Sequence, residues 1–331
     1  MMKNLVSTKR ILGAILALTI VALLSGCGAS KVEQDTALEN ISDHPFRKGY
    51  ASSERLVTAK WVADNLDNEK VKIIDIRKPE LFDEGHIPGA VNYPAKELQV
   101  EADGVKGMLP PGDAVAAKLS SLGVEPTDTI IIVDHIKNLW STRLLWTLEV
   151  YGHEDARMID GSYFSWTEGW TDGGMVKSSR NKITTASPSV KPSNYEFTAE
   201  KNESLIVALE AVKKSISDSG SVVLDTRSAE EYAGTDDRDN LRHGHIPSSI
   251  HVEWVQNVDD KGRFLPADQL KSLYGSANIN GDLDIYTLCQ TAVRAAHSWF
   301  VLQDLLGYEN VAIYDGSWIE WGNREDTPID S

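Results

Sequence analysis

Short apolar runs alternate with longer segments of helical spacing through most of this chain. Four runs rich in Val, Ile and Leu are typical of buried strands, and they lie at residues 71–75, 130–133, 222–225 and 283–288. Residues 295–306 instead carry apolar side chains close to the helical period, at Ala296, Trp299, Phe300, Leu302 and Leu306. Strands that alternate with helices predict an α/β fold in which mainly parallel sheets are flanked by helices.

The same pattern occurs twice, at a spacing of about 150 residues. The matched blocks are Asp-x-Arg at 75–77 and 225–227, Gly-His-Ile-Pro at 85–88 and 244–247, and Asp-Gly-Ser at 160–162 and 315–317. A polar insertion at residues 234–242 lengthens the second copy and is predicted to be a loop. We therefore expect two tandem domains, at 51–173 and 199–331. A Ser-, Pro- and Lys-rich linker without a buried face is expected between them, at 174–198.

The first 50 residues are predicted to be an address and a tether rather than a domain. Basic residues precede an apolar run at 11–24 that is too short to span a bilayer, as in a secretory signal. The run ends in Leu24-Ser25-Gly26-Cys27, which resembles the lipobox of bacterial lipoproteins. That resemblance implies a signal peptide at 1–26, lipidation of Cys27, and a tether at 27–50. The protein is then expected outside the cytoplasm, lipid-anchored on the periplasmic side of a bacterial membrane, with the outer membrane as one destination.

Charge and cysteine content narrow the function classes. The 331 residues include 33 basic and 49 acidic side chains, for a net charge of −16, which disfavours a nucleic-acid partner. Only two cysteines occur, so the sequence holds no disulfide framework. Cys27 is accounted for by the lipobox. Cys289 follows an apolar run and precedes the helical segment, so we expect it in a strand-to-helix turn, where the first copy carries Asp134.

These motifs together resemble the rhodanese family. The Asp-x-Arg strand end, the Gly-His-Ile-Pro block, the Cys-led turn and the Asp-Gly-Ser-Trp at 315–318 carry the resemblance, which spans residues 55–325. It implies two tandem rhodanese-like domains, of which the second, with Cys289, is catalytic. The implied activity transfers a sulfane sulfur from thiosulfate, mercaptopyruvate or polysulfide to cyanide or a thiol, through a persulfide on Cys289. The family implies no cofactor.

The turn around Cys289 suits this chemistry on physical grounds. A thiolate at a helix N-terminus is stabilised by backbone N–H groups, which would also bind the outer sulfur of a persulfide. Candidate substrate-binding residues are the rest of the turn and one strand-end cation: Gln290, Thr291, Ala292, Val293, Arg294 and Arg227. For Arg227 a structural ion pair with Asp225 or Glu231 is the alternative. If the fourth turn position needs a positive φ, Ala292 is strained where many family members have Gly.

Other interpretations remain open at this point. A non-catalytic anion-binding scaffold is the competing function, and a related phosphatase is disfavoured because only four residues separate Cys289 from Arg294. His86 and His245 occur in both copies, which favours a structural role. The acidic insertion could hold a hard cation, but a solvated loop is commoner, and we predict no metal. The first domain is expected to be structural, although it could wall the site if the two copies pack together.

Overall fold

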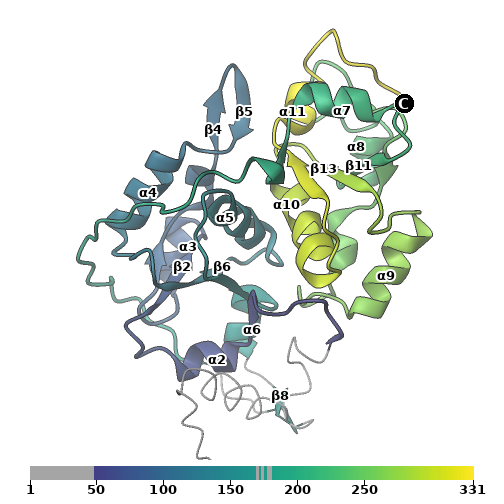
Figure 1. The fold of residues 1–331 in the computed structure, drawn as a ribbon. Coiled ribbons are helices and arrows are strands. Elements are labelled where there is room, and N and C mark those ends of the chain that lie inside the picture. The colour runs from purple at the N-terminus through teal and green to yellow at the C-terminus, as the bar shows by residue number, and fades with distance from the viewer. Residues whose placement is uncertain (1–47, 169–170, 173–174, 177–180) are drawn as a thin grey trace, which may run out of the picture. The chain divides into compact units, whose positions relative to one another are not determined.

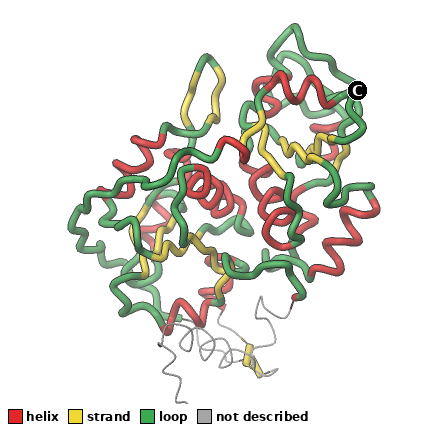
Figure 2. The backbone as a smooth tube through the Cα atoms, in the orientation of Figure 1, coloured by secondary structure: helices red, strands yellow, loops and turns green. Residues whose placement is uncertain are grey.

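The computed structural model describes residues 48–168, 171–172, 175–176 and 181–331, which belong to one compact unit of residues 40–331. Two parallel five-stranded sheets form its framework, and helices flank the strands of both (Figure 2). No helix in these ranges is long and apolar enough to cross a membrane. The predicted signal peptide and Cys27 lie outside the described residues.

The first sheet has the order β1-β7-β6-β2-β3, with every neighbouring pair parallel. Its strands are β1 (Leu56–Val57), β2 (Val71–Asp75), β3 (Val91–Asn92), β6 (Thr129–Val133) and β7 (Ala156–Ile159). The helices of this half are α2 (Ala59–Asp64), α3 (Pro79–Glu84), η2 (Ala95–Leu98), α4 (Gly112–Ser121), α5 (Leu139–Val150) and α6 (Ser162–Glu168). Two hairpins complete it: β4 (Val100–Ala102) with β5 (Val105–Met108), and β8 (Thr171–Asp172) with β9 (Met175–Val176) (Figure 1).

The second sheet repeats this order as β10-β14-β13-β11-β12. Its strands are β10 (Ile206–Val207), β11 (Ser221–Asp225), β12 (Ile250–His251), β13 (Asp284–Leu288) and β14 (Val311–Tyr314). Its helices are η3 (Glu203–Leu205), α7 (Leu209–Ser215), α8 (Ala229–Tyr232), η4 (Trp254–Asn257), α9 (Ala267–Ser276), α10 (Val293–Phe300), the π-helical turn η5 (Val301–Leu305) and α11 (Ser317–Trp321). The predicted α/β duplication is confirmed.

One hydrophobic core joins the two halves. Successive strand residues point to opposite faces of a sheet, so Ile73 and Ile74 enter different clusters. Ile74 belongs to the cluster that also holds Leu224 of the second sheet and runs through α5 and α10. The other faces have separate cores in each domain. The two domains therefore dock through α5 and α10, which both follow the central strand of their own sheet.

The two copies differ in length at the turn that leads into these helices. Five residues, 134–138, separate β6 from α5, whereas four, 289–292, separate β13 from α10. The helix compensates, because α10 and η5 run continuously and are together one residue longer than α5, which has 12 residues. The π-helical bond from the Leu306 N–H to the Val301 carbonyl takes up the extra residue. The glycine after each helix, Gly152 or Gly307, therefore follows the first residue of its turn at the same spacing of 18 residues.

The predicted linker and tether are more tightly held than their composition suggests. Tyr195 is buried at 4% exposure, and its hydroxyl bonds with His153 Nδ1 at 2.8 Å, so the expectation of a linker without a buried face was wrong. At the end of the predicted tether, Lys48 Nζ lies 2.5 Å from Asp160 and Tyr50 donates to the Phe264 carbonyl. A polar composition did not reveal these single anchoring contacts.

Candidate active site

Cys289 lies at the first position after the central strand of the second sheet, with its side chain buried at 1% exposure. The four-residue turn ends at Ala292, which is the N-cap residue of α10 and has φ 60° and ψ 5°. It makes no side-chain hydrogen bond to the helix. The left-handed geometry predicted to strain an alanine is therefore present. Alanine has no side-chain oxygen, so the cap residue itself satisfies none of the first N–H groups of α10.

Ser317 fixes the shape of this turn, a role that the sequence pattern around it did not reveal. Its Oγ accepts the Cys289 N–H at 3.3 Å and the Ala292 N–H at 3.0 Å, and donates to the Tyr314 carbonyl. The N–H of Trp318 donates to the Cys289 carbonyl at 2.9 Å. The repeated Asp-Gly-Ser motif was the available signal, but it served only as evidence for the duplication.

The equivalent turn of the first domain shows what such a loop binds. There the Asp134 carboxylate replaces the thiol and accepts backbone N–H groups at 2.8–3.2 Å, from Ile136, Asn138, Trp140 and Ser141. Ser162 Oγ accepts the Asp134 N–H at 2.8 Å, as Ser317 does for Cys289. The turn is thus a cradle for a negatively charged group. In the first domain the chain's own carboxylate fills it.

Arg294 lies beside the thiol but is bound to a carboxylate. Its Nη2 donates to Glu231 Oε1 at 2.8 Å and its Nη1 to Oε2, while Glu231 is 2% exposed. Burial by itself raises the pKa of Glu231, but the hydrogen bond and charge of Arg294 outweigh it and lower the pKa to about 2. Burial lowers the pKa of Arg294, yet its bonds to Glu231 and its interaction with Cys289 raise it overall.

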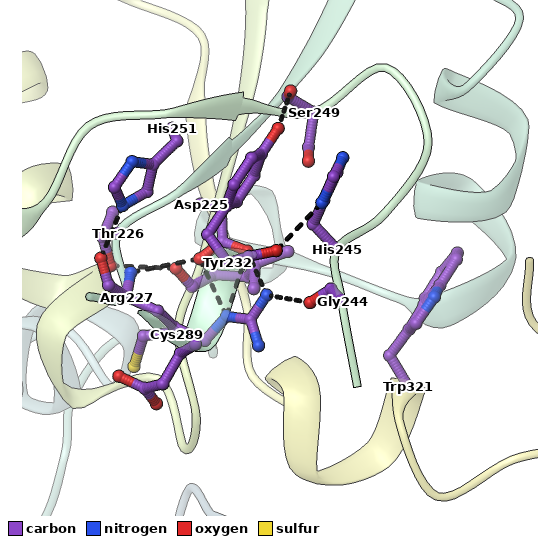
Figure 3. A network of polar contacts seen from close by, with 12 residues as sticks. Asp225, Thr226, Arg227, Tyr232, Gly244, His245, Ser249, His251, Cys289 and Trp321 are labelled. Carbon is purple, nitrogen blue, oxygen red and sulfur yellow. Dashed lines mark hydrogen bonds and ion pairs between the residues drawn. The ribbon is translucent and has the colours of Figure 1, made fainter. Parts of the chain in front are cut away.

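Arg227 forms the structural ion pair that the sequence left open as the alternative to substrate binding. Its Nη2 lies 2.6 Å from Asp225 Oδ2 and 2.8 Å from the Gly244 carbonyl (Figure 3). Its guanidinium stacks over the Trp318 ring, with 4.1 Å between the guanidinium carbon and the ring centroid. Only 1% of the side chain is exposed. Arg77 repeats the pairing with Asp75 in the domain without a thiol. The geometry therefore supports the structural ion pair that was left open as the alternative, while substrate binding by Arg227 stays a prediction.

The other predicted residues of the turn, Gln290 and Thr291, contact two different segments of the chain. Gln290 forms a reciprocal amide pair with Asn240, at 3.2 and 3.1 Å, so the polar insertion at 234–242 contacts the residue next to Cys289. Thr291 packs against Gly107 of the first domain, where an added Cβ would come within 2.7 Å. Val293 begins α10 and is 6% exposed. Neither Asn240 nor Gly107 stood out in the sequence.

The two histidines that recur in the repeated Gly-His-Ile-Pro block have structural roles in both copies. Nδ1 of His86 bonds with the Phe82 carbonyl and Nδ1 of His245 with the Tyr232 carbonyl. Each imidazole stacks on the aromatic ring of the same partner, at 3.7 and 3.9 Å between centroids. The predicted turn-stabilising role is confirmed (Figure 3). Within the described ranges, no group of three or more His, Cys, Asp and Glu side chains gathers as a metal site would.

Comparison with known proteins gives a consistent assignment. The rhodanese-like domain family matches residues 58–169 and again 208–324. A thiosulfate sulfurtransferase of Corynebacterium glutamicum is 33% identical over 297 residues, covering 87% of this chain and 94% of the relative. The sulfur carrier protein TtuD of Thermus thermophilus is 34% identical, covering 85% and 98%.

Solved structures share the fold at lower identity. An anaerobic ergothioneine biosynthesis enzyme from Chlorobium limicola superimposes with a TM-score of 0.73 at 21% identity, over 85% of this chain and 71% of that one. YnjE superimposes with a TM-score of 0.72 at 20% identity, over 85% and 69%. At these identities the likeness concerns the fold alone.

Proposed function

Since this chain belongs to the rhodanese-like family and its relatives include sulfurtransferases, we propose that it moves a sulfane sulfur through a persulfide on Cys289. The observation that carries the proposal is the turn itself. The equivalent turn of the first domain, one residue longer, binds a carboxylate through backbone N–H groups, and here a thiol takes the place of that carboxylate. A thiol in an anion cradle at a helix N-terminus is suited to attack as a thiolate.

The proposed reaction has two displacement steps. The Cys289 thiolate attacks the outer sulfur of the donor, the donor's sulfur–sulfur or sulfur–carbon bond breaks, and the leaving group departs with the electron pair. The acceptor, cyanide or a thiolate, then attacks the outer sulfur of the persulfide, and Cys289 leaves as a thiolate. Backbone N–H groups of the turn stabilise the charged sulfur in both steps, because they are already oriented before reaction.

The net charge around Cys289 affects which sulfur donors the site can bind. Arg227 and Arg294 each have a carboxylate partner, Asp225 and Glu231, so neither contributes a full positive charge to the site. Thiosulfate, mercaptopyruvate and polysulfide are the candidate donors. The relative from Corynebacterium glutamicum is named for thiosulfate, which places that donor first among those to test.

Turnover with each donor tests the proposal. Wild type and Cys289→Ser are incubated with one donor and with cyanide, and thiocyanate is measured over time. We expect turnover with at least one donor in wild type and none in Cys289→Ser. Asp134→Ser is the matched control, because it changes the same turn in the domain without a thiol and should retain turnover. Equal turnover in wild type and Cys289→Ser would contradict the proposal.

A non-catalytic anion-binding scaffold is the second candidate, favoured by the burial of Cys289 and by the strained Ala292. A scaffold would bind a donor with the same affinity after Cys289→Ser and would give no turnover with any acceptor. Hydrolysis of a small aryl phosphate that depends on Cys289 would instead indicate phosphatase chemistry.

We also propose that the protein is a lipoprotein held outside the cytoplasm through Cys27. The support is the basic start, the short apolar run and the Leu24-Ser25-Gly26-Cys27 motif. Expression of the full chain in a bacterium, with Cys27→Ala as control, tests it. We expect wild type in the membrane fraction and labelled by a fatty-acid analogue, and the control unlabelled. An unlabelled wild type would contradict lipidation.

A further inference from the structure

The two domains contact each other through equivalent hydrogen bonds near their strand-to-helix turns, residues 134–138 and 289–292. The Leu109 N–H of the first domain donates to Asp315 Oδ2 at 2.7 Å, and the Phe264 N–H of the second donates to Asp160 Oδ1 at 2.9 Å. The two donors, Leu109 and Phe264, are 155 residues apart, and so are the two acceptors, Asp160 and Asp315. Each domain therefore holds the Asp-Gly-Ser motif of the other.

A glycine of each domain also packs directly on the turn of the other. A Cβ on Gly107 would come within 2.7 Å of Thr291, next to Ala292, and a Cβ on Gly262 within 2.9 Å of Lys137 in the first turn. Gly107 and Gly262 are again 155 residues apart, and both have positive φ, 84° and 76°. The contacts are thus equivalent in position, although only one turn carries a thiol.

The contact on the cysteine turn has two additional side chains from the first domain. Arg143, fully buried, places Nη1 2.7 Å from Asp315 Oδ1 and Nη2 3.3 Å from the Gly107 carbonyl. Gln99 Nε2 donates to the Thr291 carbonyl at 2.8 Å and to the Gly107 carbonyl at 3.1 Å. Asp315 stands two residues before Ser317, which binds the Cys289 N–H. The first domain thus reaches the turn at both ends.

We propose that Gln99 and the Arg143–Asp315 pair are positioning residues, through which the first domain holds the Cys289 turn in its reactive shape. This rests on the proposed function, since it concerns the same thiol. Gln99 bonds to the Thr291 carbonyl, and Asp315 of the Arg143–Asp315 pair lies two residues before Ser317. These side chains therefore act through the turn backbone and through Ser317. If these contacts served only to dock the two domains, loss of the Asp160 contact and loss of the Asp315 contact would have equal effects.

The test compares variants on the two sides. Gln99→Met removes the bond to Thr291 without exposing a buried charge, Asp315→Asn weakens the buried pair, and Asp160→Asn is the matched control at the thiol-free turn. For each protein the second-order rate of Cys289 alkylation by iodoacetamide and the rate of sulfur uptake from a donor are measured at one pH, together with thermal unfolding.

We expect Gln99→Met and Asp315→Asn to slow alkylation and sulfur uptake by about fivefold, and Asp160→Asn to change each less than about twofold. In Gln99→Met the donor concentration for half-maximal rate should stay unchanged, because Gln99 contacts backbone rather than donor. Equal slowing by Asp160→Asn and Asp315→Asn, or unchanged rates in Gln99→Met, would overturn the proposal. If Asp315→Asn does not fold, Gln99→Met decides. If wild type takes up no sulfur, the proposed function fails, and the alkylation rates still decide the positioning role.

Discussion

Replacing Ser317 by alanine separates the shape of the cysteine turn from the stability of the fold. The hydroxyl accepts two buried backbone N–H groups, those of Cys289 and Ala292, and alanine leaves both without a partner. Each buried donor left unsatisfied costs about 1–3 kcal/mol, so the loss of both bonds should lower the free energy of unfolding by about 2–6 kcal/mol. Loss of turn alignment should also slow sulfur uptake roughly tenfold, since small displacements of reacting groups have large effects on rate.

Ser162→Ala is the matched control for that change. Ser162 Oγ accepts the Asp134 N–H at 2.8 Å in the first domain, so its loss should also reduce stability, by about 1–3 kcal/mol. It should leave sulfur uptake unchanged, because no thiol depends on that turn. Urea unfolding followed by tryptophan fluorescence gives the stabilities, and sulfur uptake is measured without urea. Equal slowing in both variants, or normal uptake in Ser317→Ala, would refute the reasoning.

Two further predictions concern pH. Arg294 lowers the pKa of Glu231 to about 2, from the ordinary glutamate pKa of 4.5. The ion pair therefore stabilises the fold fully above pH 4.5, and this stabilisation is lost as pH falls toward 2. Glu231→Gln should therefore cost about 3 kcal/mol at pH 7 and about half of that at pH 3 in urea unfolding; a cost independent of pH would contradict the pairing. Asp304 behaves oppositely, since burial, opposed by Arg55 and reinforced by Glu149, raises its pKa to about 7. The stabilisation from the protonated Asp304 carboxyl is full below pH 3.8 and is lost as pH rises to 7. The free energy of unfolding of Asp304→Asn, relative to wild type, should therefore rise by about 2 kcal/mol between pH 5 and pH 8. A constant difference between the two proteins would count against this prediction.

Local patterns in the sequence predicted what depends on local structure. Strand and helix periodicity gave the two sheets, and the repeated blocks placed Cys289 in its turn. The positive φ of Ala292 was stated only as a condition, because it rested on the Gly that many family members have at that position. These features depend on residues within one turn or strand, so the chain segment that forms them also reveals them.

Contacts between distant segments were not predictable in the same way. Arg143 and Asp315 are 172 residues apart, and their pairing depends on how the two copies dock. The partner of Arg294 was missed because Glu231 was considered only for Arg227. Tyr195 was overlooked because one aromatic residue in a polar stretch gives no periodic signal. Arg227 could be interpreted correctly only when Arg77 was seen to repeat its pairing in a domain without a thiol.

The most direct test of the account is the intact mass of the soluble chain, residues 28–331, after incubation with thiosulfate, mercaptopyruvate or polysulfide. Cys289→Ser serves as the control. We predict that wild type gains the mass of one sulfur atom with at least one donor, that the control gains none, and that cyanide removes the addition. A wild type with an intact fold and an alkylatable thiol that gains no sulfur from any donor would contradict the persulfide mechanism.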